Sequence, residues 1–244
     1  MTMPVKVAIM QPYFFPYIGY WQLIQAVDSF VVYDNIEFTK KGWFHRNRFL
    51  LQGQPELFSL PLKKDSDFLT VGERFLSDRF AVERVKLARR IEAAYRKAPY
   101  FAPAFSVWQE CLACHEDNLF QFLFHSIKTI CNYLGITTPC IVASDVAIDH
   151  RLRGQDKVIA ICQQLGARQY YNPIGGRALY QAESFSEAGL TLFFQQVGDI
   201  HYRQFQHAFQ PFLSILDVMM FNSVAEIQRM LQQVDWLVAT KVDA

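Results

Sequence analysis

Residues 5–33 decide the fold class, and they read VKVAIMQPYFFPYIGYWQLIQAVDSFVVY. Two short apolar runs, Val5–Met10 and Phe30–Tyr33, have the length and composition of buried strands. Between them, apolar residues recur at three-residue steps from Ile18 to Val27, which predicts one face of a helix. A strand, a helix and a strand within about 30 residues predict a βαβ unit with parallel strands and a right-handed crossover.

The middle of the chain has a different pattern. Residues 35–62 contain short β-like segments broken by turn residues, which form either a hairpin or an extended loop. Apolar spacing then predicts helices at 80–97, 103–115 and 118–134, the last ended by Gly135. On the first of these helices, the expected inner face carries Val82, Val85, Ala88, Ile91 and Tyr95.

The α/β pattern returns in the second half of the chain. Short segments at 140–143, 168–171 and 190–194 are predicted as strands, and 155–165 as a helix. We therefore predict an α/β fold whose parallel or mixed sheet is flanked by helices, of the Rossmann-like or nucleotidylyltransferase-like kind. The expected organisation is a single domain over residues 1–244, with an α/β core at 1–65 and 136–244 and a helical insertion at 80–135.

Composition and charge exclude several classes of protein. Half of the 244 residues are hydrophobic, which excludes a disordered or fibrous chain. The 24 lysines and arginines nearly balance 23 acids, so no general attraction to nucleic acid or to an anionic membrane is expected. No apolar run is long enough to span a bilayer, and Met1–Met10 lacks the apolar core of a signal peptide. We expect a cytoplasmic protein with five reduced cysteines.

The segment after the first strand is a candidate binding loop, because ligands of parallel sheets bind beyond the carboxyl ends of the strands. Two prolines stiffen it and aromatic side chains crowd it. Its candidate ligand-binding residues are Gln11, Tyr13, Gly19 and Tyr20. The alternative is that these aromatic rings are core packing at the top of the sheet, although packing has no use for the Gln11 amide.

Asp34 directly follows the second predicted strand, so it is expected at the same sheet edge as Gln11. A carboxylate there can accept from a sugar hydroxyl or act as a general base, and Asp34 is our first candidate for that base. The G-x-G-x-x-G fingerprint does not follow the first strand, so no nicotinamide or flavin cofactor is predicted. A nucleotide is the one cofactor left open, and no metal site is predicted because no zinc-binding spacing occurs.

A basic and aromatic cluster lies within an acid-free stretch at 39–54. Arginine forks bind phosphate oxygens and tryptophan offers a flat face to a ring, so the pattern indicates a phosphate-bearing ligand. In an extended segment Arg46 and Arg48 share one face and Asn47 the other. The alternative is a solvated basic strand. The candidates here are Lys41, Trp43, Arg46, Asn47 and Arg48 for binding, with His45 as the second candidate for general base.

Two loops of the second half have polar residues and backbone amides near expected element ends, which suits anions or hydroxyls. They supply the binding candidates Gln155, Asp156, Asn172, Gly175 and Gly176.

Several runs of this sequence resemble the WbqC-like protein family along essentially the whole chain. These runs are 8–20 (AIMQPYFFPYIGY), 40–43 (KKGW), 46–48 (RNR), 61–64 (PLKK), 154–156 (GQD), 172–176 (NPIGG) and 220–223 (MFNS). The resemblance implies a role in bacterial O-antigen or other surface-polysaccharide synthesis, with transfer of a glycyl or similar acyl group to an amino sugar. It implies no catalytic residue set.

Three hypotheses follow. The leading one is a transferase acting on a nucleotide-activated sugar or another phosphorylated small molecule. The second is an ATP-using activating enzyme of the nucleotidylyltransferase kind. In that case Tyr17-Ile-Gly-Tyr20 stands where such enzymes carry H-x-G-H and brings no positive charge. The third is a non-catalytic partner of a glycan-synthesis enzyme.

Overall fold

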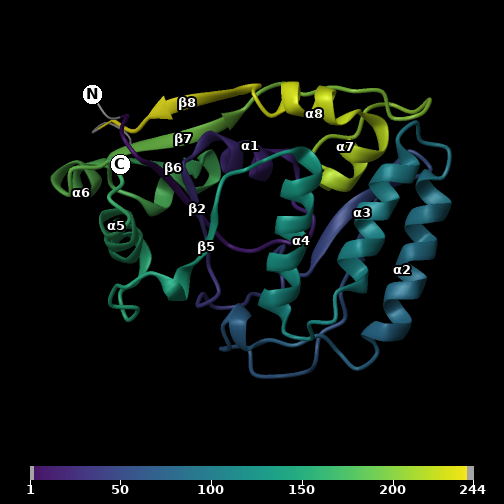
Figure 1. The fold of residues 1–244 in the computed structure, drawn as a ribbon, viewed down its shortest axis with the longest axis horizontal. Helices are drawn as coiled ribbons and strands as arrows, with labels where there is room; N and C mark the ends of the chain where they lie inside the picture. Colours follow the sequence, from purple (N-terminus) through teal and green to yellow (C-terminus); the bar gives the residue numbers. More distant parts are fainter. Residues whose placement is uncertain (1–2, 241–244) are drawn as a thin grey trace.

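The computed structural model describes residues 3–240, which form a mixed sheet with helices on both faces (Figure 1). Within these residues the sheet has six strands in the order β5-β2-β1-β6-β7-β8, and all neighbouring pairs except β7–β8 are parallel. The strands are β1 (Lys6–Met10), β2 (Ser29–Val32), β5 (Cys140–Val142), β6 (Gln169–Pro173), β7 (Thr191–Val197) and β8 (Val234–Val238). The predicted α/β class is confirmed. Residues 1–2 and 241–244 of the predicted unit lie outside the described part.

β1, α1 (Ile18–Ala26) and β2 form the βαβ unit predicted at 5–33. β1 lies between β2 and β6, and its residues Val7, Ala8 and Ile9 are buried. A strand in the middle of a parallel sheet is covered on both faces, which explains why β1 is an unbroken apolar run. The loop after β1 therefore leaves from the centre of the carboxyl edge of the sheet.

Two clusters of buried side chains cover the two faces of the sheet. On one face α1 packs through Trp21, which belongs to the same cluster as the helices of the middle segment. On the other face lie α5 (Gly154–Gln164), with Ile161, and α6 (Ala182–Glu187), with Phe185. The sheet is thus the middle layer between two sets of helices (Figure 1).

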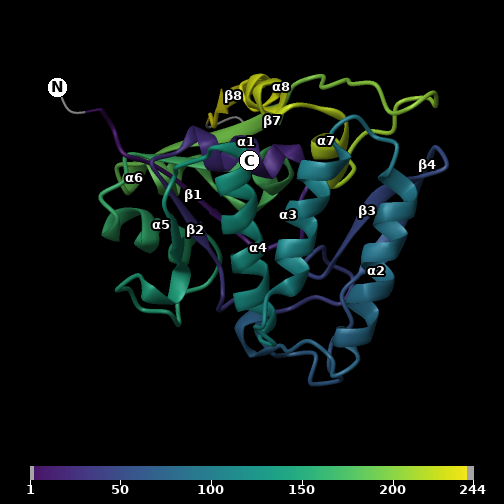
Figure 2. The same cartoon turned by 45° about the vertical axis from the view of Figure 1, so that its right-hand side comes forward.

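The helical block predicted at 80–135 consists of three long helices that lie side by side in both views (Figures 1 and 2). These are α2 (Phe80–Tyr95), α3 (Phe101–Ala113) and α4 (Leu119–Leu134), and Gly135 ends α4 in the left-handed conformation as predicted. The predicted inner face of α2 is partly wrong, because Val82 and Val85 are exposed. The stripe that packs inward is Phe80, Leu87, Ile91 and Tyr95.

The segment left open as hairpin or loop is an antiparallel hairpin of β3 (Arg46–Leu51) and β4 (Gln54–Ser59). Its two-residue turn places both Gln52 and Gly53 at positive φ, 51° and 78°, as a type I′ turn requires. The hairpin is a separate sheet beside the main one, and Phe49 and Phe58 anchor it in the core.

The C-terminal part of the chain contains elements that the sequence pattern did not predict. These are α7 (Ile215–Phe221), α8 (Val224–Met230) and the edge strand β8. Short 3-10 helices lie at Val71–Glu73, Ala143–Asp145 and Ile174–Leu179. Every residue of α7 is buried, so this short helix is part of the core, where it contacts α3, α8 and β3.

Candidate functional site

The direction of strand addition reverses beside β1. The chain goes from β1 to β2 and β5 on one side, and later adds β6 and β7 on the other side. Ligands of open α/β sheets bind at such a reversal, beyond the carboxyl ends of the strands. A cleft of about 480 Å³ opens at this point, between the ends of β1, β6 and β7 and the hairpin strand β3. Ligand sites commonly enclose roughly 300–1,000 Å³. We call this space the switch-point cleft.

The switch-point cleft brings together six of the residues predicted from sequence. They are Tyr13, Tyr20, Trp43, Asn47, Arg48 and Gly175. The other nine lining residues were not among the predicted site residues, and Tyr17, Gln195 and Phe212 are three of them. The first binding loop, the basic cluster and the β6 loop therefore meet at one place although they are far apart in the chain.

Arg48 supplies the charge of the cleft. Its guanidinium carbon lies 5.4 Å from the centroid of the Trp43 ring, a cation–π arrangement. Its Nε is buried without a hydrogen-bond partner, and none of the residues lining the cleft is acidic. A buried donor without a partner costs on the order of 1–3 kcal/mol. Arg48 is therefore the cation that an anion entering the cleft would meet.

The other cations of the basic cluster are engaged differently. The Arg46 guanidinium also lies over Trp43, at 5.6 Å, but its Nε donates to the Gly42 carbonyl at 2.9 Å and its Nη2 donates to the Lys41 carbonyl. These two hydrogen bonds of Arg46 hold together the loop at 41–46, which contains Trp43. The Lys41 side chain is exposed outside the cleft lining.

Asn47 anchors the first binding loop to the hairpin. Its buried Nδ2 donates to the carbonyls of Phe14, at 3.2 Å, and Phe15, at 2.7 Å. The Ser214 hydroxyl donates to the same Phe15 carbonyl at 2.8 Å. Phe15 itself has a φ of 49°, which is unusual for a residue with a bulky side chain. Asn47 therefore acts mainly by positioning two walls of the cleft against each other.

Gln11 orients the tyrosines at the end of β1. Its side-chain oxygen accepts from the Tyr13 hydroxyl at 2.7 Å, and its carbonyl accepts from the Tyr20 hydroxyl at 3.0 Å. Burial, with Tyr17 nearby, raises the pKa of Tyr13 to about 12. The Tyr13 phenol is therefore neutral at physiological pH and acts as a hydrogen-bonding wall.

Gln195, in the second half of β7, is a buried polar residue that the sequence reasoning missed. Its Nε2 donates to the Gly19 carbonyl at 2.8 Å and to Gln22 Oε1 at 3.2 Å. Its own Oε1 is buried without a partner at the wall of the cleft. Gln195 could have been predicted from the sequence, because it directly follows an apolar run, as Gln11 does.

The two candidates for a general base lie outside the lining of the cleft. Asp34 follows β2 as predicted, and its Oδ1 accepts from the backbone amide of Ser144 at 3.0 Å. His45 packs against Phe38, and burial together with Arg46 and Arg74 lowers its pKa to about 4. Neither group therefore lines the cleft together with Arg48.

The remaining candidates also serve local structure. The Gln155 side chain donates to Ser184 Oγ at 3.2 Å and accepts from the Gln181 amide at 3.1 Å, which ties α5 to α6. Asp156 is exposed in the first turn of α5.

At the β6 loop, Asn172 accepts from the Tyr170 hydroxyl at 3.2 Å, and its amide leaves no room for a side chain at Gly176. At the start of α1, the Tyr17 ring fills the space beside Gly19.

Comparison with known proteins identifies the family. A sequence model of the WbqC-like protein family matches residues 11–229. The chain belongs to the WbqC-like family. It is also 30% identical over 225 residues to "Uncharacterized protein Rv1507c" of Mycobacterium tuberculosis (strain ATCC 25618 / H37Rv), which covers 91% of this chain and 95% of that protein. No solved structure matches.

The WbqC-like match spans every residue that lines the switch-point cleft except Met10. The described residues of this WbqC-like chain contain no group of three or more His, Cys, Asp or Glu side chains placed to hold a metal ion. All five cysteines are free. Over residues 3–240 there is also no helix with the length and apolar character needed to cross a membrane.

Proposed function

We propose that this WbqC-like protein is a transferase of bacterial surface-polysaccharide synthesis that binds a nucleotide-activated sugar, or a related phosphorylated small molecule, in the switch-point cleft. The transferred group in this proposal is a glycyl or similar acyl group, and its acceptor is an amino sugar. The observation that carries the proposal is Arg48, a cation with a buried unpartnered donor in a cleft without carboxylates.

The walls of the cleft suit the rest of such a ligand. Trp43 and Tyr13 offer ring faces for a base or a sugar, and the arginine fork suits phosphate oxygens. The unpartnered Oε1 of Gln195 can accept from a ring hydroxyl or amine. A mostly apolar cleft with a few convergent polar groups is the usual composition of a small-molecule site.

Calorimetric titration with UDP-N-acetylglucosamine tests the proposal. A charged hydrogen bond contributes on the order of 1.5–3 kcal/mol, so Arg48→Ala is expected to weaken binding by roughly ten- to a hundredfold. Arg89→Ala, an exposed arginine on α2, is the matched control and should bind like the wild type. Equal affinity for wild type and Arg48→Ala would refute the assignment.

A thermal-shift screen separates the neighbouring hypothesis of an ATP-using activating enzyme. Ligands that bind the folded state raise the unfolding temperature. Stabilisation by UDP-N-acetylglucosamine and by UDP supports the transferase. Stabilisation by ATP with magnesium alone would favour the activating enzyme.

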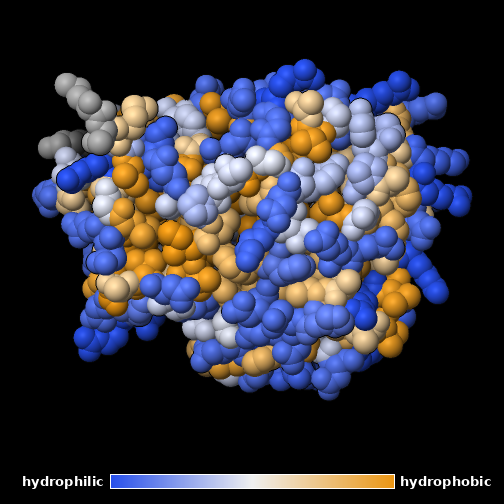
Figure 3. All heavy atoms as spheres, in the orientation of Figure 1, coloured by the Kyte–Doolittle hydropathy of each residue, from blue (hydrophilic) through white to orange (hydrophobic). Residues whose placement is uncertain are grey.

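A second candidate function, a non-catalytic partner of a glycan-synthesis enzyme, is favoured by one observation. On the face shown in Figure 3, apolar side chains gather in the part of the surface near α5. Contiguous exposed apolar surface marks interaction sites. Absence of binding by every nucleotide and nucleotide sugar in the screen would move the assignment to this candidate.

A further inference from the structure

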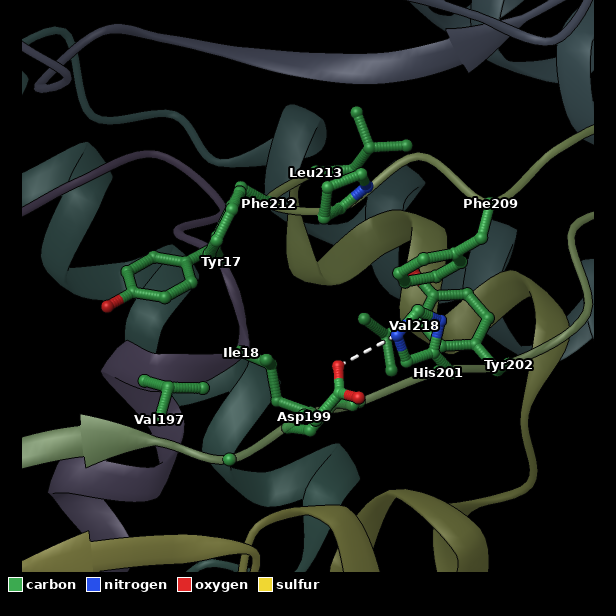
Figure 4. Close-up of a pocket in the computed structure, with 13 residues that line it drawn as sticks. Tyr17, Ile18, Val197, Asp199, His201, Tyr202, Phe209, Phe212, Leu213 and Val218 are labelled. Carbon is green, nitrogen blue, oxygen red and sulfur yellow. Dashed lines mark ion pairs between the residues drawn. The ribbon is translucent and has the colours of Figure 1, made fainter.

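A second cavity, of about 410 Å³, adjoins the switch-point cleft (Figure 4). Tyr17, Val197 and Phe212 belong to the walls of both spaces. The rings of Tyr17 and Phe212 make an edge contact with their centroids 6.5 Å apart. We call this cavity the second chamber. Its outer wall is the segment at 198–213, which connects β7 to α7.

The two spaces have opposite charge. Arg48 is the charged residue that lines the switch-point cleft. The charged lining of the second chamber is Asp199, whose carboxylate is 91% exposed and faces His201, with Oδ1 2.7 Å from the His201 Nε2; no lysine or arginine lines the chamber. A ligand group that suits one space is therefore disfavoured in the other, which is a physical basis for binding two different molecules side by side.

The rest of the second chamber is apolar and aromatic. Ile18, Leu213 and Val218 supply aliphatic surface, and Tyr202 and Phe209 supply rings. Figure 4 shows the Asp199 carboxylate directed into the space between Tyr17 on one side and Tyr202 on the other. A carboxylate among aromatic rings attracts an organic cation by charge and by cation–π interaction.

A hydrogen bond and ring packing hold the aromatic side chains of the second chamber in place. The Tyr202 hydroxyl donates to Asp217 Oδ2 at 2.7 Å, and Asp217 is fully buried. Phe209 packs against both His201 and Tyr202, with ring centroids 4.6 and 5.1 Å apart.

Phe212 has a φ of 57° and is 68% exposed. Such backbone strain in a bulky residue concentrates at functional sites. Phe212 lies in the wall shared by the two spaces, so its backbone strain indicates that this wall has a functional role.

We propose that the second chamber binds a small organic amine with an apolar body, the ammonium group lying between Asp199 and the aromatic rings. Its role as the co-substrate that sits beside the nucleotide-activated sugar rests on the proposed function. The binding itself does not, because all of its contacts lie in the second chamber.

The test is a titration with 2-phenylethylamine, and with 2-phenylethanol as a neutral molecule of the same body, in the absence of any nucleotide. Methyl ¹³C NMR of Ile18, Leu213 and Val218 reports on the chamber directly. The amine is expected to bind the wild type about fivefold more tightly than the alcohol, as a solvent-exposed charge together with a cation–π contact allows. Asp199→Asn should remove this preference, and Asp145→Asn, an exposed control, should keep it.

Equal affinity of amine and alcohol, shifts confined to other methyl groups, no binding of either, or an unchanged preference in Asp199→Asn would each overturn the proposal. Because no nucleotide is present, these outcomes are independent of whether Arg48 binds a nucleotide sugar.

Discussion

Asp217 makes the stability of this protein depend on pH in a direction opposite to that of most carboxylates. The side chain is fully buried in α7, where it accepts hydrogen bonds of 2.7 Å from the Tyr95 hydroxyl, the Tyr202 hydroxyl and Gln204 Nε2. Burial raises its pKa from 3.8 to about 6, although the three donors act in the opposite direction. The folded state therefore holds the proton more tightly than the unfolded chain does.

The sign and size of the effect follow from this difference. Between about pH 4 and pH 6 the folded state binds more protons, so the contribution of Asp217 to stability is complete below that window and is lost as the pH rises through it. At 1.36 kcal/mol per pKa unit the loss is about 3 kcal/mol. Asp217→Asn removes the titration. The free energy of unfolding of the wild type, relative to this variant, should fall by about 2.5 kcal/mol from pH 4 to pH 7, because the rest of the loss occurs below pH 4.

Urea unfolding at a series of pH values measures the effect. Asp145→Asn, an exposed carboxylate outside the network, is the control, and its difference from the wild type should be flat. A flat difference for Asp217→Asn would refute the reasoning. Should that variant fail to fold, ¹³C titration of the wild-type carboxyl groups measures the same pKa, and a midpoint below about 4 would contradict the prediction.

Three further predictions concern the hairpin and its neighbours. Asn47→Ala removes the Asn47 donor from the Phe14 carbonyl and leaves Ser214 as the donor to the Phe15 carbonyl, so it should lower the free energy of unfolding by about 1–3 kcal/mol. The exposed Asn132→Ala on α4 should be nearly neutral, and equal effects would contradict the anchoring role. Gln52→Gly relieves a φ of 51° in the β3–β4 turn and should stabilise the protein by about 0.5–1 kcal/mol in urea unfolding, whereas Gly53→Ala should destabilise it. His45 has a lowered pKa of about 4, so its ring signals in NMR should stay constant from pH 6 to pH 8, and a midpoint inside that range would show the burial argument to be wrong.

The place of the cleft could be predicted from sequence because it depends on strand ends. The apolar runs of β1 and β2 are buried on both faces and are visible as unbroken runs, so the residues that follow them are found by counting. Tyr13, which lines the cleft, was predicted in this way. Arg48 and Trp43 also line the cleft, and they were predicted from chemistry alone, as a cation and a ring in a stretch without acids.

Other parts depended on packing that no local pattern encodes. Every residue of α7 is buried, so the helix has no polar face and no 3.6-residue contrast between apolar and polar positions. On α2 the valines at 82 and 85 are apolar but face solvent, since the neighbouring α3 covers a different stripe. Arg46 stabilises its own loop rather than serving as a second free cation. This role follows only from its hydrogen bonds to the Gly42 and Lys41 carbonyls in the structure.

Tyr95 gives the helical block a role that its place in the sequence conceals. Its hydroxyl accepts from the Leu50 amide at 2.6 Å and donates to Asp217, so one atom of α2 joins the hairpin to α7. A segment inserted between two halves of a sheet is often regarded as an ornament that can be excised. Here excision of 80–135 would remove Tyr95. This residue links β3, which carries Arg48 of the switch-point cleft, to Asp217, which lies behind the second chamber. The block is part of the framework that keeps the two spaces adjacent.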